Sequence, residues 1–460
     1  MVSGELVTRN YIESSSSSLL NPSPDSSSLT AALMLPWEPD ADLTHVDYRQ
    51  TVESPESFAF KHKPEEIMPT SEQQLKCSDS IHMPSKEAPL KVYSQYKYVN
   101  EHLTGERFQL VAEREAATVL WLMEPFYGYR TLPPDALVNQ FPFESVLTVK
   151  DLFAIVCRRA AAVDAECDQL MTEDAFSPAW LMPTFDLQSE LPKFVSYYQH
   201  RQRARLDNHW IVKPWNLSRG LETLITGQLA EIVKLRNALP KVVCKYIDRP
   251  VLFRRDDLRS TTSSAPVSVK FDLRFIVLLK NVQPLQLYVY RNFWIRFANR
   301  AFSMDELESY EKHFTVMNYA ASAEGEGQEG KVQLRQMFCS EFIGHFDAQY
   351  GKGSWARLQT DTYAAIKEAF ECATMKEPPA GIGHCVQSRA MYGIDVLPRW
   401  RRSSNGGKDE EEEEVMQPTL LEVNWMPDCK RATEYYPDFF NEVFATLFTD
   451  EPVSENMLLL

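Results

Sequence analysis

Three oxygen-bearing side chains near the C-terminus have the types and spacing of a site for a hard cation. Asp395 lies in YGIDVLP, and Glu422 and Asn424 lie two residues apart in TLLEVNW. Because alternate residues of a strand share a face, Glu422 and Asn424 are expected on one side of a strand, and Leu421 and Val423 on the other. Mg²⁺ usually takes one or two carboxylates together with phosphate oxygens. The two segments therefore predict a strand pair that holds Mg²⁺ against the phosphates of ATP.

A second group of candidates lies in VKFDLRF. A period of two places Lys270, Asp272 and Arg274 on one face of a strand. The other face carries the apolar Phe271, Leu273 and Phe275. Charges in such alternation are costly to bury, so the charged face is either wet, as on an edge strand, or lines a polar site.

Further cations stand in apolar contexts elsewhere in the chain. Arg296 lies in WIRFA, Lys213 near the end of WIVKP, and Lys150 in LTVKDL. Each one alone is compatible with an ordinary surface position. Taken together with the basic residues of VKFDLRF, they suit a polyanion such as a triphosphate. The extended segment VVCKYID, with Lys245, Tyr246 and Ile247, can pair its backbone with the edge of adenine.

Other classes of protein are disfavoured. No GxxxxGK[ST] loop is present, and HRDxxxxN and DFG are also missing, which excludes a P-loop enzyme and weakens a protein-kinase interpretation. The net charge of −16 argues against nucleic-acid binding. No apolar run reaches the roughly 18 residues of a membrane helix, and the N-terminus lacks a signal-peptide core, so no membrane contact and a cytoplasmic location are expected. None of the eight cysteines forms a CxxC pair, so free thiols are expected rather than a zinc or redox site.

The 460 residues divide by composition. Residues 1–32 are expected to be disordered and residues 33–90 to be a poorly packed lead-in. Residues 91–200 are assigned to the N-terminal and linker part of a larger module. Residues 201–450 form its main domain, and an acidic loop at 403–414 lies within that domain.

The hydrophobic patterns predict strands interleaved with helices. Helices are expected from about Thr148, over LETLITGQLAEIVKLRNA, over SWARLQTDTYAAIKEAFECAT and after Pro437. Strands are expected for DNHWIVKP, KVVCKYI, YGIDVLPRW and TLLEVNW. A further three, VKFDLRFIVLL, QLYVYRN and FWIRFA, are expected to form an antiparallel meander. This mixture indicates an α+β or mixed α/β fold with antiparallel sheets and flanking helices.

In this order, the pieces resemble the tubulin–tyrosine ligase family of ATP-grasp enzymes. The resemblance runs from about LMLPWEP at residue 33 to the C-terminus. The amino-acid sequences of these segments are closest to one branch of the ligase-like proteins. In that branch a SET-like domain usually precedes the ligase region. The matching segments are NQFPFESVLTVKDL, WIVKPWNLSRG, VVCKYIDRPVLF, KFDLRFIVLL, WIRFANRAF, HFTVMNY, SRAMYGIDVLPRW, LLEVNWMPDC and YPDFFNEVFATLF.

The resemblance implies roles for the candidate residues. ATP would be held by Lys150 and Lys213 at its phosphates, by Lys245, Tyr246 and Ile247 at adenine, and by Lys270 and Asp272 close by. Arg274 and Arg296 would hold the γ-phosphate and the acyl-phosphate that follows, and Asp395, Glu422 and Asn424 would bind Mg²⁺. The implied reaction joins an amino-acid substrate to a carboxylate of a tubulin C-terminal tail, in the cytoplasm and in association with microtubules.

Two segments depart from the family pattern. The glycine-rich flap that usually follows the WIVKP strand is reduced to Arg219 and Gly220, and is expected to run straight into a helix. Val316 stands where active ligases tend to have an amide. Three interpretations therefore stay open, namely an active ligase, a pseudo-ligase that binds nucleotide and tubulin or another protein, and a ligase with a different acceptor.

Overall fold

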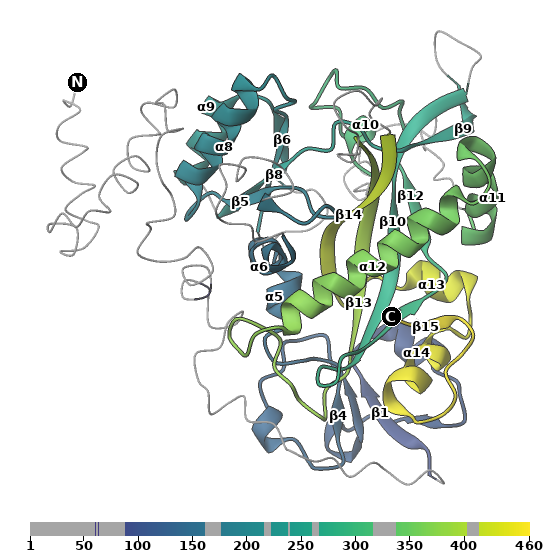
Figure 1. Ribbon diagram of the computed structural model, residues 1–460. Coiled ribbons are helices and arrows are strands. Elements are labelled where there is room, and N and C mark those ends of the chain that lie inside the picture. Colours follow the sequence, from purple (N-terminus) through teal and green to yellow (C-terminus); the bar gives the residue numbers. More distant parts are fainter. Residues whose placement is uncertain are drawn as a thin grey trace, which may run out of the picture.

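The computed structural model describes residues 60, 63, 88–161, 176–215, 222–237, 240–259, 266–315, 337–402 and 414–460. These residues form three sheets with helices around them (Figure 1). The predictions for residues 1–32, for almost all of 33–90 and for all but the last residue of the acidic loop at 403–414 lie outside the described residues. The division into domains stays a prediction.

The largest sheet has seven strands in the order β14-β13-β10-β11-β15, and β9 and β12 also pair with β10. All its pairings are antiparallel. Its strands are β9 (Leu252–Arg259), β10 (Pro266–Asn281), β11 (Gln286–Tyr290), β12 (Trp294–Phe297), β13 (Ala390–Arg402), β14 (Glu414–Trp425) and β15 (Met457–Leu459).

The expected meander is wrong in one respect. β11 and β12 do not pair with each other; each pairs with a different stretch of β10, at residues 277–281 and 271–274. β9 pairs with residues 266–270 of the same strand. The reason is the length of β10, whose 16 residues are long enough to pair with several short strands at different places along it.

The two faces of β10 follow the predicted alternation. Phe271, Leu273 and Phe275 lie in the main hydrophobic core, whereas Ile276 and Leu278 lie in a second core on the other face. The edge-strand interpretation is wrong, because β10 has partners along both edges. Lys270 and Asp272 are only 5% and 2% exposed, so the charged face lines a polar interior site.

Helices cover the main core. The longest, α12, packs with α5, α6 and α11 on the apolar face of the sheet (Figure 1). In α12, Leu358, Ala365, Ile366, Ala369 and Phe370 are buried, which is the spacing of one helical face. The helices of this layer are α5 (Ser145–Thr148), α6 (Lys150–Cys157), the 3₁₀ turn η6 (Arg158–Ala160), α11 (Cys339–Tyr350) and α12 (Ser354–Thr374).

A small parallel sheet, in the order β2-β1-β3-β4, lies beside the second core with α4, α13 and α14. The Trp121 ring of β3 stacks on Phe444 of α14, with ring centroids 4.8 Å apart. The elements are β1 (Leu90–Ser94), α4 (Lys97–His102), β2 (Phe108–Leu110), η4 (Arg114–Ala116), β3 (Val119–Trp121), η5 (Tyr129–Thr131), β4 (Leu137–Val138), α13 (Lys430–Tyr435) and α14 (Phe439–Phe448).

The third sheet is antiparallel, in the order β5-β8-β6-β7, and carries its own aromatic core beneath α8. Trp210 of β6 is fully buried there, in edge contact with Phe194 of α8. The elements are β5 (Thr184–Asp186), α8 (Leu191–Arg203), β6 (Trp210–Pro214), β7 (Leu224–Thr226), α9 (Leu229–Lys234), η8 (Leu235–Asn237) and β8 (Lys241–Lys245). A further short helix, α10 (Tyr310–His313), contacts β10 of the large sheet.

The helix expected over residues 221–238 is corrected in its first part. Leu224–Thr226 is a strand that pairs with β6, and the helix begins only at Leu229. The β-branched Ile225 and Thr226 favour a strand, and the Thr226 hydroxyl accepts a hydrogen bond from the amide of Gln228, 3.0 Å away, at the turn. The chain after β6 therefore returns as a hairpin, and does not run straight into a helix.

The fold class predicted from the sequence, α+β with antiparallel sheets and flanking helices, is confirmed, with one small parallel sheet added. The helices after Thr148, over SWARLQTDTYAAIKEAFECAT and after Pro437 are present, as are the predicted strands. The six described cysteines are free, as expected. Within the described ranges, no helix combines the length and the apolar composition needed to span a membrane.

Candidate functional site

A cavity of roughly 950 Å³, counted to its open mouth, lies between the third sheet and the charged end of the large sheet. β6 and β8, with Thr223 just before β7, form one wall, and β10, β12, β13 and β14 form the other, with the start of α6 and the segment around α10 at its margins. Polar and apolar side chains share the lining. Its apolar part includes Met182, Ile211, Leu397 and Leu421.

Ten of the twelve candidate residues named from the sequence line this cavity. They are Lys150, Lys213, Lys245, Tyr246, Ile247, Lys270, Asp272, Arg296, Asp395 and Glu422. The other two lie just behind the lining. Arg274 bonds to Asp395, and the Asn424 amide donates a hydrogen bond of 3.2 Å to Glu422. Segments far apart in the sequence thus converge on one site.

Strand register explains the convergence of the acidic and basic residues. Arg274 lies opposite Asp395 across β10 and β13, and Asp272 lies opposite Arg296 across β10 and β12. The Arg274 Nη2 atom is 2.9 Å from Asp395 Oδ2, and Arg296 reaches Asp272 Oδ1 at 2.5 Å and Asp395 Oδ2 at 2.7 Å. The two arginines and two aspartates therefore form one buried ion network.

This network fixes the charge of Asp395. Burial alone would raise the pKa of its carboxyl, but the guanidinium groups of Arg274 and Arg296 outweigh burial and hold that pKa well below its usual range. The same contacts raise the pKa of both arginines despite their burial. Asp395 is thus an anion whose two oxygens are both already bonded to guanidinium groups.

Three lysines face the cavity from different walls. Lys150, at the start of α6, lies 3.7 Å from Glu422, and burial together with the neighbouring Lys213 lowers its pKa. Lys270 has no carboxylate within ion-pair distance among the described residues. Burial, with Lys213 nearby, lowers the pKa of Lys270 to about 7. These ammonium groups repel one another, so an anion placed among them reduces that repulsion.

The Lys270 ammonium is held by an aromatic cluster. Its Nζ atom lies 3.0 Å from the Tyr246 hydroxyl and 4.5 Å from the centre of that ring. The same hydroxyl is 2.8 Å from Nδ1 of His313, a 3% exposed side chain whose pKa burial and Lys270 lower. Thr315 donates its hydroxyl to Asp272 Oδ2. His313 and Thr315 were not predicted as site residues from the sequence. Both lie in HFTVMNY, a segment that carries the family resemblance, and that match is the signal that could have identified them.

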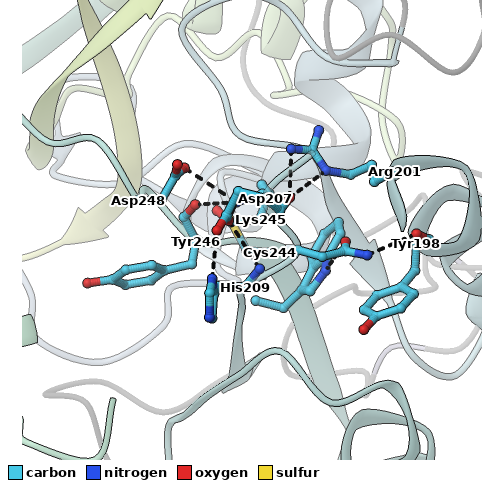
Figure 2. A network of polar contacts seen from close by, with 10 residues as sticks. Tyr198, Arg201, Asp207, His209, Cys244, Lys245, Tyr246 and Asp248 are labelled. Carbon is cyan, nitrogen blue, oxygen red and sulfur yellow. Dashed lines mark hydrogen bonds and ion pairs between the residues drawn. The ribbon is translucent and has the colours of Figure 1, made fainter. Parts of the chain in front are cut away.

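The predicted adenine-binding segment is braced from behind (Figure 2). The 1% exposed ammonium of Lys245 donates to Asp207 Oδ1 at 2.5 Å and to the Tyr246 carbonyl at 2.8 Å. Asp207 also bonds to the His209 ring at 2.6 Å, and its own carbonyl accepts two hydrogen bonds from Arg201. The Lys245 side chain therefore supports the backbone of this segment, and its ammonium is not available for nucleotide phosphates.

The backbone of the same segment has one open donor. The amides of Lys245 and Tyr246 donate to the carbonyls of Pro183 and His209, at 2.8 and 2.9 Å. The next amide, that of Ile247, has no hydrogen-bond acceptor in the described part of the chain. Because Ile247 lines the cavity, this amide is suited to an acceptor on the edge of a planar ring.

The expected alternation along β14 is wrong at one residue. Asp395 pairs with Glu422 and Val396 pairs with Leu420, so Leu421 is the extra residue of a β-bulge. Leu421 consequently lines the cavity beside Glu422, whereas Val423 packs into the main core. The bulge thus places an apolar side chain next to the Glu422 carboxylate. Strict alternation along the strand would have placed it on the opposite face.

The predicted metal ligands differ in how well they fit Mg²⁺. Glu422 and Asn424 are accessible, with the Glu422 side chain 26% exposed at the cavity wall. Asp395 fits less well, because both of its oxygens are already bonded to guanidinium groups. No group of three His, Cys, Asp or Glu side chains within the described ranges has the arrangement of a metal site. Glu422 and Asn424 therefore fit a Mg²⁺ that takes most of its other ligands from phosphate and water.

Parts of the predicted site lie outside the described residues. These are Arg219 and Gly220 in the flap segment, and Val316. Beyond the flap segment, Thr223 lines the cavity.

Comparison with known proteins gives a consistent result. A profile of the Tubulin-tyrosine ligase family matches residues 130–459. Three relatives carry the name Tubulin--tyrosine ligase-like protein 12, which confirms the predicted branch. The one from Homo sapiens is 45% identical over 79% of this chain and 51% of its own length. Those from Mus musculus and Caenorhabditis elegans are 40% and 38% identical, over 97% and 86% of this chain and 63% and 54% of their own. The chain thus spans half to two thirds of the length of these relatives.

Proposed function

Because the chain belongs to the tubulin-tyrosine ligase family, we propose that it is an ATP- and Mg²⁺-dependent ligase of ATP-grasp type that joins an amino acid to a carboxylate of a tubulin C-terminal tail. The observation that carries this proposal is the cavity. Its lining includes Ile247, whose backbone amide has no acceptor among the described residues, and the side chains of Lys150, Lys213 and Lys270. This arrangement suits a nucleotide triphosphate.

The positions of the residues support a division of roles. The Ile247 amide donates to adenine, while Tyr246 and Leu421 enclose the ring. Lys150 and Lys213 neutralise the phosphates. Glu422 and Asn424 hold Mg²⁺, which supplies further neutralisation of phosphate charge when it is bound. Arg296 lies at the cavity wall where negative charge develops during phosphoryl transfer.

The proposed reaction has two steps. A carboxylate oxygen of the tubulin tail attacks the γ-phosphorus of ATP, and ADP leaves, which forms an acyl-phosphate. The neutral amine of the amino acid then attacks the acyl carbon. Phosphate leaves with the bonding electrons, and the nitrogen loses one proton to solvent or to the departing phosphate. Positioning and charge neutralisation supply most of the rate enhancement, because little covalent chemistry by the protein is needed.

The experiment is intact-mass spectrometry of tubulin incubated with the purified protein, Mg-ATP and either Tyr, Glu or Gly in separate samples. A mass gain in one sample supports the ligase and identifies its amino acid. Nucleotide binding is measured on the same preparation by calorimetry. No gain in any sample, together with measurable ATP binding, rejects the ligase.

One observation favours a second candidate, a pseudo-ligase that binds nucleotide and regulates tubulin modification without ligating. Both oxygens of Asp395 are bonded to guanidinium groups, so a metal has to compete with two permanent cations of the chain. A pseudo-ligase binds ATP with little dependence on Mg²⁺. Calorimetry with Mg²⁺ and with EDTA separates the two candidates.

A further inference from the structure

A second cavity, of roughly 670 Å³ counted to its mouth, lies at the end of β14 beyond the nucleotide cavity. It is bounded by the segment 125–129, by residues 140–149 around α5 and by Trp425. Trp425 packs against the main core, whereas Glu422 faces the nucleotide cavity. No candidate named from the sequence lines this second cavity, and the proposed ligase chemistry does not use it.

A single carboxylate stands in this cavity. Glu144 is the only ionisable acid or base among its lining residues other than tyrosine. One of its oxygens, Oε2, accepts the Tyr392 hydroxyl at 2.7 Å and the Phe141 amide at 3.2 Å. The other oxygen, Oε1, has no donor in the described part of the chain. Glu144 is thus fixed by two donors on one oxygen and open on the other.

The walls around this carboxylate are aromatic. Phe126, Tyr127, Tyr129, Phe141, Phe143 and Trp425 contribute to the lining. Phe126 and Tyr129 meet edge to face with centroids 4.9 Å apart. Aromatic faces attract a cation, and one open carboxylate oxygen accepts a hydrogen bond from it. An anion or a second carboxylate finds no complementary charge in this lining.

The backbone at this cavity is strained at two residues. Phe143, in the lining, and Met426, next to the lining residue Trp425, have φ angles of 59° and 48°, in the left-handed region that bulky side chains rarely adopt. The buried amide of Gln140 accepts from the Phe126 amide at 2.8 Å and donates to the Glu124 carbonyl at 2.7 Å, which ties down the opposite wall. Such strain persists only where the surroundings enforce it, and it concentrates at binding sites.

We propose that this cavity is a second binding site, which takes an alkylammonium group whose charge pairs with Glu144 and whose carbon stem packs between the aromatic rings. The group is either the side chain of a lysine in a protein partner or a small primary amine. Both present the same chemistry. The proposal is independent of the ligase reaction.

The site has a predictable pH dependence. Burial raises the pKa of Glu144 to about 7, and the hydrogen bonds from Tyr392 and Phe141 offset only part of that effect. The other titratable groups facing the cavity are Tyr127 and Tyr129. Because only the ionised carboxylate pairs with an ammonium, amine affinity is expected to rise about tenfold between pH 6 and pH 8.

The experiment measures binding of n-butylammonium to the whole chain by saturation-transfer NMR, with n-butanol as the neutral analogue. We expect saturable binding of the amine only, weakened at least tenfold in Glu144→Gln. That variant retains an acceptor for Tyr392 and is expected to fold. Tyr127→Ala, which removes an exposed wall, is expected to weaken binding without disturbing the core. In a second set of samples, Nα-acetyl-lysine amide, which keeps its ε-ammonium, is compared with Nα-acetyl-norleucine amide. Binding of the lysine compound only is expected if the site takes a lysine side chain of a protein partner.

The matched control is Glu124→Gln, which removes a neighbouring carboxylate whose side chain is 59% exposed and which does not line the cavity. We expect it to change amine affinity less than twofold. Equal binding of amine and alcohol, equal loss in both Gln variants, or an affinity that falls from pH 6 to pH 8 would each overturn the proposal.

Discussion

At the scale of single residues, the site combines anions that are already neutralised with cations that are not. Asp272 and Asp395 are paired with Arg296 and Arg274, whereas Lys270 contacts a hydroxyl and aromatic rings and has no carboxylate within ion-pair distance among the described residues. Excess positive charge is therefore concentrated on the lysines. This distribution makes phosphate binding, rather than metal binding, the first property to test.

Glu422 is the accessible carboxylate of the site. Glu422→Gln removes one charge that faces Mg²⁺, so we expect ligation to fall on the order of a hundredfold. Unfolding free energy is expected to change by less than about 0.5 kcal/mol, because the side chain is partly exposed. Ligation is measured by intact mass and stability by urea unfolding. Glu434→Gln, on an exposed part of α13, is the control, and an unchanged ligation rate in Glu422→Gln argues against the metal role.

Lys270 provides a pH test. Its pKa of about 7 means that it loses its charge near neutral pH in the free protein, so nucleotide affinity is expected to weaken from pH 6 to pH 8.5. Lys270→Arg keeps its charge throughout and is expected to flatten this profile. Because ATP itself titrates identically in both samples, the difference between the two calorimetric profiles isolates Lys270. Parallel profiles contradict the assignment.

At the scale of elements, the segment after β8, which we propose as the adenine hinge, is held in position by the side chain of Lys245. Lys245 ties the Tyr246 carbonyl to Asp207, which lies just before β6. The ion pair therefore connects the strand that ends in the hinge with its neighbour in the third sheet (Figure 2).

Asp207→Asn tests this brace. It leaves the buried Lys245 with Asp248, 3.5 Å away, as its one remaining carboxylate among the described residues, so we expect a loss of about 1–3 kcal/mol in unfolding free energy and a severalfold weaker affinity for ATP. Burial opposes ionisation of Asp207, but Lys245 lowers its pKa below the usual value. The stability difference is thus present above about pH 4 and shrinks as the pH falls below that value. Asp256→Asn on β9 is the control, and an unaltered ATP affinity contradicts a positioning role.

The β13 strand requires a glycine where it passes Arg274. A Cβ atom at Gly393 would lie 2.7 Å from Pro427 Cβ and 3.1 Å from Arg274 Cδ. Gly393→Ala is therefore expected to displace the arginine and to cost about 1–3 kcal/mol. The measurements are thermal unfolding and ATP binding, with Gly344→Ala, which meets no atom within 4 Å, as the control. Equal unfolding temperatures of the two variants would show that Pro427 and Arg274 move aside at little free-energy cost, and would contradict this prediction.

At the scale of the whole molecule, charge decides how the chain meets an acidic partner. The chain carries a net charge of −16, and six consecutive acidic residues occupy 409–414, of which the first five, 409–413, lie between the two strands that frame the site. Replacing these five residues by glutamine is expected to raise affinity for tubulin at low salt and to have little effect at about 0.3 M salt, because screening shortens the range of the repulsion. Sedimentation with microtubules at several salt concentrations measures this. An increase that does not depend on salt contradicts the electrostatic explanation.

Much of this architecture is local, and the sequence alone determined it. The alternation in VKFDLRF predicts its two faces, the spacing in SWARLQTDTYAAIKEAFECAT predicts α12, and matching segments identify the family. These features depend on neighbours a few residues apart, whose side-chain directions are set by the backbone period.

Only the tertiary structure decided the rest, because the remaining features depend on strand register and on partners distant in the chain. It pairs Asp395 with two arginines, turns Leu421 into the cavity through a bulge, directs Lys245 to Asp207, and makes Leu224–Thr226 a strand beside β6. The first three of these contacts have no local signal, and for Leu224–Thr226 the β-branched residues favour a strand without specifying its partner. The second cavity, with Glu144 facing aromatic rings from separate segments, arises in the same way.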